Sequence, residues 1–246
     1  MLSVVIPVYN EAKCLSATLL AVGDHLAALA TPTGYEIVVA DDGSRDESVA
    51  LAQRLADRLP IRIERLPVNR GKGAAVRAGM LAARGDPVFY FDADLSTPLA
   101  EMERFLAALA AGADVVVGTR KHPDARIERW QPPHRVWLGR CYTRLANAVL
   151  RLAVSDFTCG FKAFRAGAAR EIFTRQRLDR WSFDAEILFL ASHLGLRIAE
   201  LPVRWADRPD SRVRVGSAMV KSFAELLAIR GHARRGDYGP ESASHR

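Results

Sequence analysis

Two carboxylates follow one of the most apolar short segments of the chain. Asp92 and Asp94 stand one residue apart directly after residues 87–91, whose aromatic and β-branched side chains predict a buried strand. Two such carboxylates cannot both stay buried and ionised without a cation. Their hard oxygen atoms suit Mg²⁺ or Mn²⁺, which commonly bridge to substrate phosphates. The pair predicts a divalent-metal site, and the alternative is that two surface acids precede a helix opened by Thr97 and Pro98.

The first half of the chain alternates between strand and helix patterns, which positions these carboxylates. Strands are predicted at 2–8, 35–40, 61–66, 88–91 and 115–117, and helices at about 10–29, 44–59, 73–83 and 98–110, the second beginning with a capping box at 44–47. This alternation indicates βαβ units. We therefore expect an α/β fold with a mostly parallel central sheet flanked by helices.

Ligands of such sheets bind beyond the carboxyl ends of the strands. There the sequence carries four clusters, namely Pro7, Tyr9, Asn10 and Glu11; Asp41 and Asp42; Gly71 and Lys72 within the loop 69–73; and Asp92 with Asp94. We expect all four clusters to converge on one rim of the sheet. Each also has a purely structural alternative, because Gly71 permits a tight turn, Pro7 can end a strand and the Asp41-Asp42 pair can form a turn.

The regular alternation ends at Gly118. Residues 119–134 are polar, basic and contain prolines, which predicts a long loop. A helix at 135–152, a strand at 197–203 and an amphipathic helix at 218–229 follow. We expect one domain over 1–215 with halves 1–118 and 119–215, then a helix within 216–235 and a disordered tail at 236–246.

Positive charge is concentrated in one window of this 246-residue chain. The net charge is +7, and residues 120–151 alone hold eight basic residues against two acidic ones, a net charge of +6. Such a window attracts nucleic acid, an anionic membrane surface or a phosphorylated substrate. The alternative is a solvated basic face without a specific partner.

Three scattered cysteines and the absence of a signal-peptide pattern favour a reducing, cytoplasmic compartment. Residues 15–30 are the most apolar long stretch, but Asp24 and His25 interrupt them, so no transmembrane span is predicted.

Two loops of the sequence limit the kinds of nucleotide-binding site that the chain could have. Residues 7–11 lack the glycine pattern of dinucleotide-binding folds, and residues 69–73 do not match the phosphate-binding loop of NTPases. What remains is a nucleotide whose diphosphate is held through a metal at Asp92 and Asp94. A metal-held diphosphate is a good leaving group, because the cation neutralises the charge that develops as the bond breaks.

These motifs resemble a known family. Residues 4–11, 38–44, 69–73 and 92–94 are similar to the inverting glycosyltransferases of family 2, which have the GT-A fold. Residues 118–120, 156–162, 181–186 and 201–205 look like the polyprenyl-phosphate sugar synthases, and 94–98 with 159–162 are most similar to dolichyl-phosphate β-glucosyltransferases and their bacterial relatives. The resemblance covers about residues 2–215.

The resemblance implies donor-site roles for most of the residues above. Pro7, Tyr9, Asn10 and Glu11 would line the nucleoside pocket, Asp41 would hydrogen-bond the base beside Asp42, and Gly71 and Lys72 would pack near the nucleotide. Asp92 would approach the ribose or sugar, and Asp94 the Mg²⁺ or Mn²⁺ ion. Ser96 stands where dolichyl-phosphate mannose synthases usually have Gln as a further metal ligand, which favours a glucosyl-type relative.

The resemblance also implies an acceptor site. Arg120 and Arg135 match positions that hold the acceptor phosphate, and with Asp92, Asp94 and Asp156 they form our candidate catalytic set. For Asp156, Asp184 and Glu186, substrate contact and a helix-surface role both stay open. A phosphate acceptor is already anionic, so a strong general base is not essential, and none of the six histidines adjoins a motif.

We expect an inverting hexosyltransferase that moves glucose from UDP-glucose to a polyprenyl or dolichyl phosphate. Attachment would be peripheral, at the anionic cytoplasmic face of a membrane, through the basic window and the helices near 135–152 and 218–229. The alternatives are a family 2 enzyme with a soluble or polysaccharide acceptor and a basic nucleic-acid-binding protein. We expect no nucleic-acid partner, because the acidic rim would repel a phosphate backbone without a metal.

Overall fold

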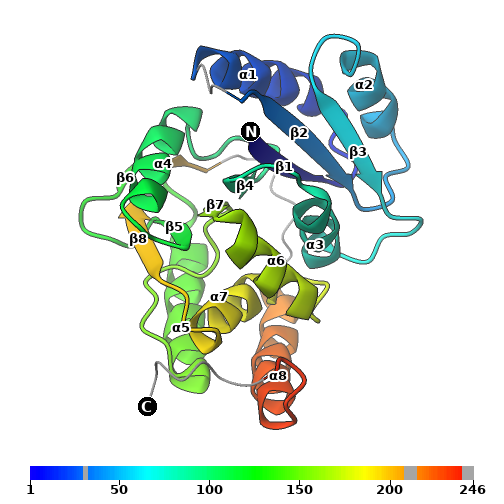
Figure 1. Cartoon of the computed structure of the whole chain (residues 1–246). Helices are drawn as coiled ribbons and strands as arrows, with labels where there is room; N and C mark the ends of the chain where they lie inside the picture. The colour runs from blue at the N-terminus through cyan, green and yellow to red at the C-terminus, as the bar shows by residue number, and fades with distance from the viewer. Residues whose placement is uncertain (30–32, 208–214, 240–246) are drawn as a thin grey trace.

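A computed structural model describes residues 1–29, 33–207 and 215–239 (Figure 1). Within these residues the central sheet has seven strands in the order β3-β2-β1-β4-β7-β5-β8. Its strands are β1 (Leu2–Val8), β2 (Tyr35–Asp41), β3 (Ile61–Arg65), β4 (Val88–Phe91), β5 (Val115–Thr119), β7 (Phe161–Phe164) and β8 (Ile198–Pro202). All pairings are parallel except those of β7, which runs antiparallel to both β4 and β5. The predicted α/β fold with a mostly parallel sheet is confirmed.

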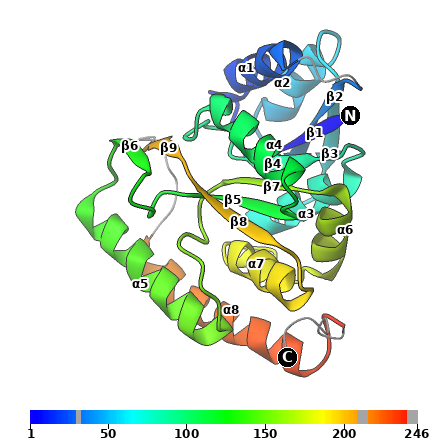
Figure 2. The same ribbon diagram turned by 60° about the vertical axis from the view of Figure 1, so that its left-hand side comes forward.

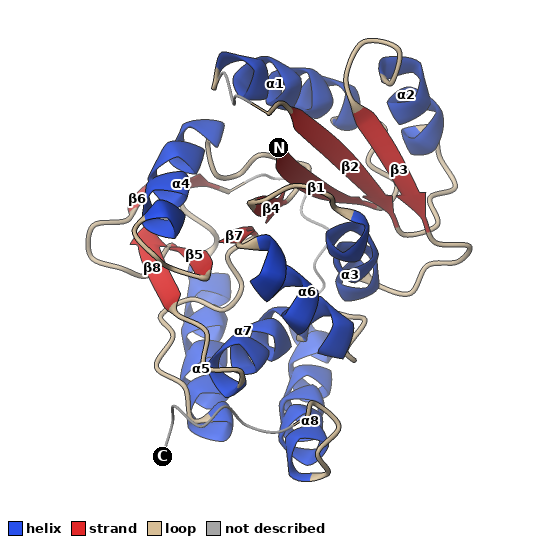
Figure 3. Cartoon of the chain, viewed as in Figure 1, coloured by secondary structure: helices blue, strands red, loops and turns tan. Residues whose placement is uncertain are grey.

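Helices cover both faces of the sheet (Figures 2 and 3). On one face lie α1 (Leu15–Ala28), α2 (Ser48–Leu55) and α4 (Met102–Ala110), the last preceded by the short helix η1 (Leu99–Glu101). On the other lie α3 (Lys72–Ala82), α5 (Pro133–Leu150), α6 (Ala166–Arg175), α7 (Phe183–His193) and α8 (Val215–Arg234).

The two hydrophobic cores follow from strand alternation. In β1, Val5 joins the core beneath α3, whereas Val4 and Ile6 join the core beneath α1. Burial on both faces makes the strand a continuous apolar run, as expected for a covered parallel sheet.

The second half of the chain holds more regular structure than its sequence predicts. The predicted loop 119–134 contains β6 (Arg126–Arg129), which pairs with β9 (Arg204–Ala206). The strand β7 and the helices α6 and α7 were not predicted. Every α7 residue except Ser192 is buried, so this helix has no amphipathic pattern to detect.

Two local predictions need correction. The helix α1 begins at Leu15 rather than near residue 10. The expected capping box at 44–47 does not form, because the Ser44 hydroxyl accepts a hydrogen bond from the Asn10 N–H (2.9 Å) and the α2 N-cap has no side-chain hydrogen bond. The Ser48 N–H donates instead to Asp46 Oδ1 (3.0 Å).

The C-terminal region is partly ordered where a tail was predicted. Within the expected tail 236–246, Tyr238 is buried, so ordered structure extends past residue 236, and residues 240–246 lie outside the described part of the chain. In the described segments, no helix combines the length and apolar character that crossing a bilayer requires.

Candidate active site

The loops after β1 and β2 are hydrogen-bonded to each other. Besides the bond from Asn10 to Ser44, the Arg45 N–H donates to Asn10 Oδ1 (2.8 Å) and the Glu11 N–H donates to Ser48 Oγ (2.8 Å). Asn10 adopts a positive φ of 56°, which asparagine tolerates better than most residues. These bonds bring the first two predicted clusters together.

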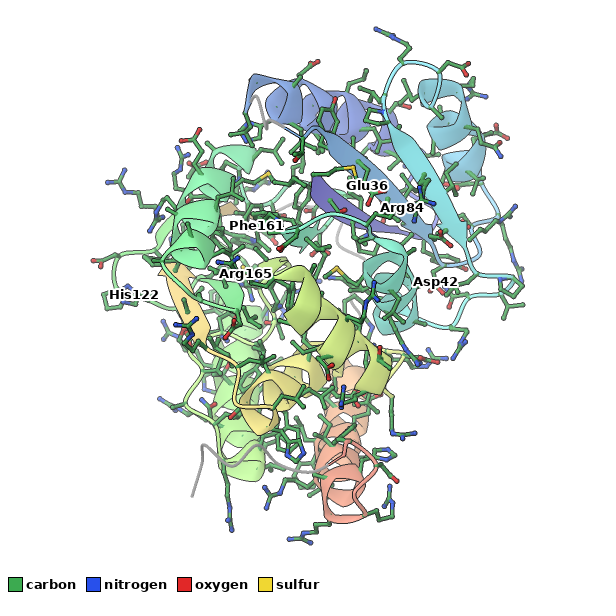
Figure 4. All side chains as sticks on the ribbon, viewed as in Figure 1. Glu36, Asp42, Arg84, His122, Phe161 and Arg165 are labelled. Atoms are coloured by element: carbon green, nitrogen blue, oxygen red, sulfur yellow. The ribbon has the colours of Figure 1, made fainter. Side chains whose placement is uncertain are left out.

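Asp42 joins the second cluster to the third. Its carboxylate accepts hydrogen bonds from Asn69 Nδ2 (2.7 Å), the Arg70 N–H (2.8 Å) and the Gly71 N–H (2.9 Å). Figure 4 shows Asp42 beside the beginning of α3. Burial raises the pKa of Asp42, and the two backbone N–H groups oppose that shift.

Asp41 faces into the protein. Its side chain is fully buried, its carboxylate accepts from the Ser44 N–H (3.1 Å), and Arg65 Nε lies 3.3 Å from Oδ2. A direct contact of Asp41 with a nucleotide base stays a prediction, and its observed contacts hold the turn after β2.

Lys72 links the third cluster to the fourth. Its Nζ lies 2.5 Å from Asp92 Oδ1, and it also lies 5.9 Å from the ring centroid of Trp181. Burial of the ammonium lowers its pKa, but the charges of Asp92 and Asp184 outweigh that effect, so the pKa of Lys72 is above its ordinary value. All four clusters are therefore joined along one rim.

Gly160 sets the position of Asp92. A Cβ at residue 160 would lie 2.2 Å from Asp92 Oδ2, and the Asp92 N–H donates to the Gly160 carbonyl (3.2 Å). Any larger residue would have to displace the carboxylate. The steric need to leave room for Asp92 thus explains why the 156–162 motif has glycine at position 160.

Asp94 completes the predicted metal site. Its Oδ1 accepts from the Ser96 N–H (2.9 Å), and burial followed by the charge of Asp92 raises the pKa of Asp94. No group of three or more His, Cys, Asp or Glu side chains that could hold a metal occurs among the described residues. Two carboxylates nevertheless fit a divalent cation, because Mg²⁺ is commonly held by one or two carboxylates together with substrate phosphates and water.

These carboxylates line a cavity of about 630 Å³. Charged side chains in its lining include Lys72, Asp92, Asp94, Arg120 and Asp184. Apolar and aromatic side chains of β6, α5 and the segment between them also line it, among them Ile127, Trp130, Val136, Leu138 and Tyr142. A ligand with a charged head and an apolar extension would match these two kinds of lining.

Arg120 is held rigidly inside the cavity. Its Nε and Nη2 pair with the two carboxylate oxygens of Asp156 (2.8 and 3.0 Å), and Nη2 also donates to Thr158 Oγ1 (2.8 Å). The guanidinium lies 5.2 Å from the ring centroid of Trp205. Burial alone would raise the pKa of Asp156, but Arg120 and Lys121 hold it well below its usual range. The predicted pair Arg120 and Asp156 is therefore in direct contact.

Lys121 and Arg135 add positive charge to the same cavity. Lys121 Nζ lies 3.4 Å from Asp156 Oδ1, and burial followed by the neighbouring Arg120 charge lowers the pKa of Lys121. Arg135 is half-buried in the first turns of α5 and forms no ion pair with any described residue. Arg135, like Arg140 on the same helix, can therefore accept a new anion in the cavity.

A buried network that sequence reasoning missed lies behind the cavity. Lys162, on β7, is fully buried, and its Nζ donates to Asp184 Oδ1 (2.6 Å) and Tyr90 Oη (3.0 Å). Asp184 lines the cavity, whereas Glu186 is turned away from it. Of the three acids left open, Asp156 is fully buried against Arg120 and Glu186 binds the backbone before α7, so only Asp184 is placed for substrate contact. The sequence signal that could have revealed this network is Lys162, a single lysine within an otherwise apolar segment.

Several predicted residues do not line this cavity, namely Pro7, Tyr9, Asn10, Glu11, Asp41, Asp42, Gly71 and Asp156. Asp156 lies behind Arg120. The others lie at the ends of β1 and β2, in the loops after these strands or just before α3, and their nucleotide contacts stay predictions. His122 does line the cavity, although no role was predicted for it from the sequence because it adjoins none of the motifs. Figure 4 shows it on the opposite side of the view from Asp42.

The chain is similar to known proteins over most of its length. Residues 3–173 match the family described as Glycosyl transferase family 2. A dolichyl-phosphate beta-glucosyltransferase of Trichomonas vaginalis is 34% identical over 241 residues, covering 94% of this chain and 71% of that protein. Another, from Drosophila melanogaster, is 34% identical over 240 residues, covering 93% of this chain and 74% of that protein.

A solved structure extends the comparison to the fold. Glucosyl-3-phosphoglycerate synthase from Mycobacterium tuberculosis, crystallised with Mn²⁺, UDP and phosphoglyceric acid, superposes with a TM-score of 0.64 at 19% identity, covering 99% of this chain and 80% of that chain. At this identity the likeness bears on the fold alone, and it confirms the expected GT-A architecture. The chain therefore belongs to glycosyl transferase family 2.

Proposed function

We propose that this glycosyltransferase moves glucose from UDP-glucose onto a polyprenyl phosphate of the dolichyl type, with inversion at the anomeric carbon. The observation that carries the proposal is the single cavity that joins the acids Asp92 and Asp94 to the cations Arg120, Lys121 and Arg135. The relatives named above, which are dolichyl-phosphate beta-glucosyltransferases, support the sugar and the acceptor class.

On the donor side, Asp92 and Asp94 would hold Mg²⁺ or Mn²⁺ together with the diphosphate of the nucleotide sugar. When bound, the cation would neutralise the negative charge that develops on the departing UDP. Lys72 lies beside Asp92 and can contribute a second positive charge to the same group. The predicted nucleoside-binding residues after β1 and β2 would hold the uridine.

On the acceptor side, the phosphate would bind among Arg120, Lys121 and Arg135. One of its oxygens attacks the anomeric carbon, the bond from that carbon to the UDP oxygen breaks on the opposite face, and the configuration inverts. Because this oxygen is already anionic at neutral pH, the site must orient the reactants rather than remove a proton. A planar guanidinium such as that of Arg135 can donate two parallel hydrogen bonds to a phosphate.

The surface around β6 and α5, beside the cavity, supports docking at an anionic membrane surface. Trp130 and Trp137 are 64% and 63% exposed, and they stand among the exposed arginines 126, 129, 140 and 144. Tryptophan prefers the membrane–water interface, and each arginine near an anionic surface contributes about 1 kcal/mol. This arrangement would present the apolar side of the cavity to the bilayer that contains the acceptor.

The decisive experiment offers labelled UDP-glucose, UDP-galactose and GDP-mannose with polyprenyl phosphate, with Mn²⁺, with Mg²⁺ or with EDTA. We expect transfer from UDP-glucose in the presence of metal, and a loss of at least a hundredfold in Asp94→Asn. Transfer to soluble phosphates but not to the lipid would indicate a soluble acceptor. Turnover that EDTA and Asp94→Asn leave undiminished would contradict the donor site.

A further inference from the structure

The turn that follows α8 is anchored in the protein interior. Tyr238 is only 1% exposed, and its ring contacts Phe189 and His193 of α7, with centroids 6.1 and 6.5 Å apart. Its hydroxyl donates a hydrogen bond to Glu186 Oε1 (2.6 Å). Arg175 Nε donates to the Tyr238 carbonyl (3.0 Å), which fixes the backbone of the turn as well.

Glu186 connects this turn to the segment before α7. Besides the Tyr238 hydroxyl, its carboxylate accepts from the backbone N–H groups of Arg177 (3.0 Å) and Leu178 (2.8 Å). Glu186 is fully buried, and burial raises the pKa of its carboxyl group, while these donors oppose that shift. A buried carboxylate that lost one of these donors would hold residues 177–178 less firmly.

Residues 176–181 in turn pack against the beginning of α3. Gln176 Nε2 donates to the Gly73 carbonyl (3.0 Å), and the Ala74 N–H donates to the Asp179 carbonyl (3.0 Å). Arg70 Nη2 pairs with Asp179 Oδ2 (2.8 Å).

The two segments are in contact without spare room. A Cβ at Gly71 would lie 2.5 Å from the Asp179 carbonyl oxygen, and one at Gly73 would lie 2.7 Å from the Leu178 carbonyl oxygen. A shift of residues 177–180 must therefore move residues 70–74, which carry Lys72 and which Asp42 holds from the other side.

We propose that Tyr238 is a positioning residue for the donor site: through Glu186 and residues 177–180 it fixes the glycine loop that carries Lys72. The inference rests on the proposed function in one respect, namely that residues 70–74 face the nucleotide. Tyr238 itself touches neither substrate, and its effect is on the affinity for the nucleotide rather than on the chemical step.

The test is Tyr238→Phe, which keeps the ring and removes only the hydroxyl. We expect the Kd for UDP in the presence of Mn²⁺, measured by calorimetry, and the KM for the nucleotide sugar to rise about three- to tenfold. The kcat and the KM for the lipid acceptor should change less than twofold. Tyr35→Phe is the matched control, because its hydroxyl donates to the Gly23 carbonyl (3.3 Å) within α1, on the other face of the sheet.

A double-mutant cycle tests the route itself. Tyr238→Phe and Asp179→Asn should be non-additive in UDP affinity, because both act on residues 70–74 through the same segment. If Tyr238→Phe lowered the Tm but left UDP affinity and donor KM unchanged, the hydroxyl would serve stability alone and the positioning role would be overturned. Strict additivity in the cycle would also overturn it.

A measurement on the wild-type protein tests the same inference if Tyr238→Phe folds poorly. Hydrogen exchange at the N–H groups of Arg177 and Leu178 should slow when UDP and Mn²⁺ bind, whereas unchanged exchange would overturn the inference. Failure of the wild-type protein to bind UDP at all would overturn the proposed donor as well. Normal UDP binding that is identical in Tyr238→Phe would overturn only the role of Tyr238.

Discussion

Lys72 Nζ lies 2.5 Å from Asp92 Oδ1, so one of the two carboxylates of the candidate metal site already has a cationic partner. The ion pair joins the first turn of α3 to the end of β4, and the lysine side chain is largely shielded from solvent. A divalent cation that bound Asp92 would have to share this carboxylate with the ammonium or displace it. Once displaced, the ammonium would be within reach of the diphosphate of the donor.

Lys72→Met should therefore separate metal affinity from activity. Removal of the competing ammonium should tighten binding of Mn²⁺ alone by about three- to tenfold, since tenfold corresponds to about 1.4 kcal/mol. Transfer should fall at the same time, because the diphosphate loses a positive charge. Titration of Mn²⁺ by electron paramagnetic resonance measures the first effect, with Arg54→Met on the exposed face of α2 as control. Unchanged or weaker Mn²⁺ binding in Lys72→Met would contradict the competition.

Arg135→Ala should affect acceptor use far more than donor use. Because Arg135 has no described ion-pair partner to leave uncompensated, its loss should leave the fold intact and raise the acceptor KM about tenfold. Slow hydrolysis of the nucleotide sugar in water should stay within twofold of wild type. Arg54→Ala, on the exposed face of α2 and outside the cavity, is the matched control. An equal loss of transfer and hydrolysis would remove Arg135 from the acceptor site.

Membrane binding offers a separate test of the surface around β6 and α5. Replacing both Trp130 and Trp137 with Ala should weaken binding to anionic liposomes at low salt at least tenfold, because two exposed indoles lose their interfacial contacts. Arg140→Ala with Arg144→Ala should weaken it several-fold and in a salt-dependent manner. The double variant of Arg54 on α2 and Arg58 in the turn after it should bind like wild type, because α2 lies at the opposite end of the molecule from α5 in Figure 1. A wild-type protein that ignored anionic liposomes would exclude this docking face.

The first 118 residues could be predicted well because each strand and helix there shows its own pattern. The strands are short apolar runs, and the polar residues at their ends must meet once the sheet is parallel, as the contact of Lys72 with Asp92 illustrates. The second half was predicted less well because its elements are buried without periodicity. β7 is buried along its whole length and enters the sheet between β4 and β5, a placement that no local pattern specifies.

The residues of the candidate site also differ in how well the sequence predicts them. Asp92, Asp94, Arg120 and Asp156 could be identified from motifs, and the structure brings all four to one cavity or its wall. The network of Lys162, Tyr90 and Asp184 could not, because its members come from three elements and only tertiary packing joins them. The carboxylate of Asp41 has partners within its own turn and on β3, and its contact with a nucleotide base stays a prediction.

The ion pair between Arg120 and Asp156 predicts how stability changes with pH. Because the folded pKa of Asp156 lies below the unfolded value of about 3.9, the pair contributes its full stability above that value and loses it as the pH falls toward the folded pKa. Asp156→Asn should cost about 3–5 kcal/mol at pH 7, because it leaves the buried Arg120 guanidinium without its charge partner. The loss of stability between pH 5 and pH 3 should then be smaller in the variant than in wild type. Urea unfolding at pH 7, 5 and 3 measures both effects, and parallel pH curves for the two proteins would show that Asp156 titrates alike in the folded and unfolded states.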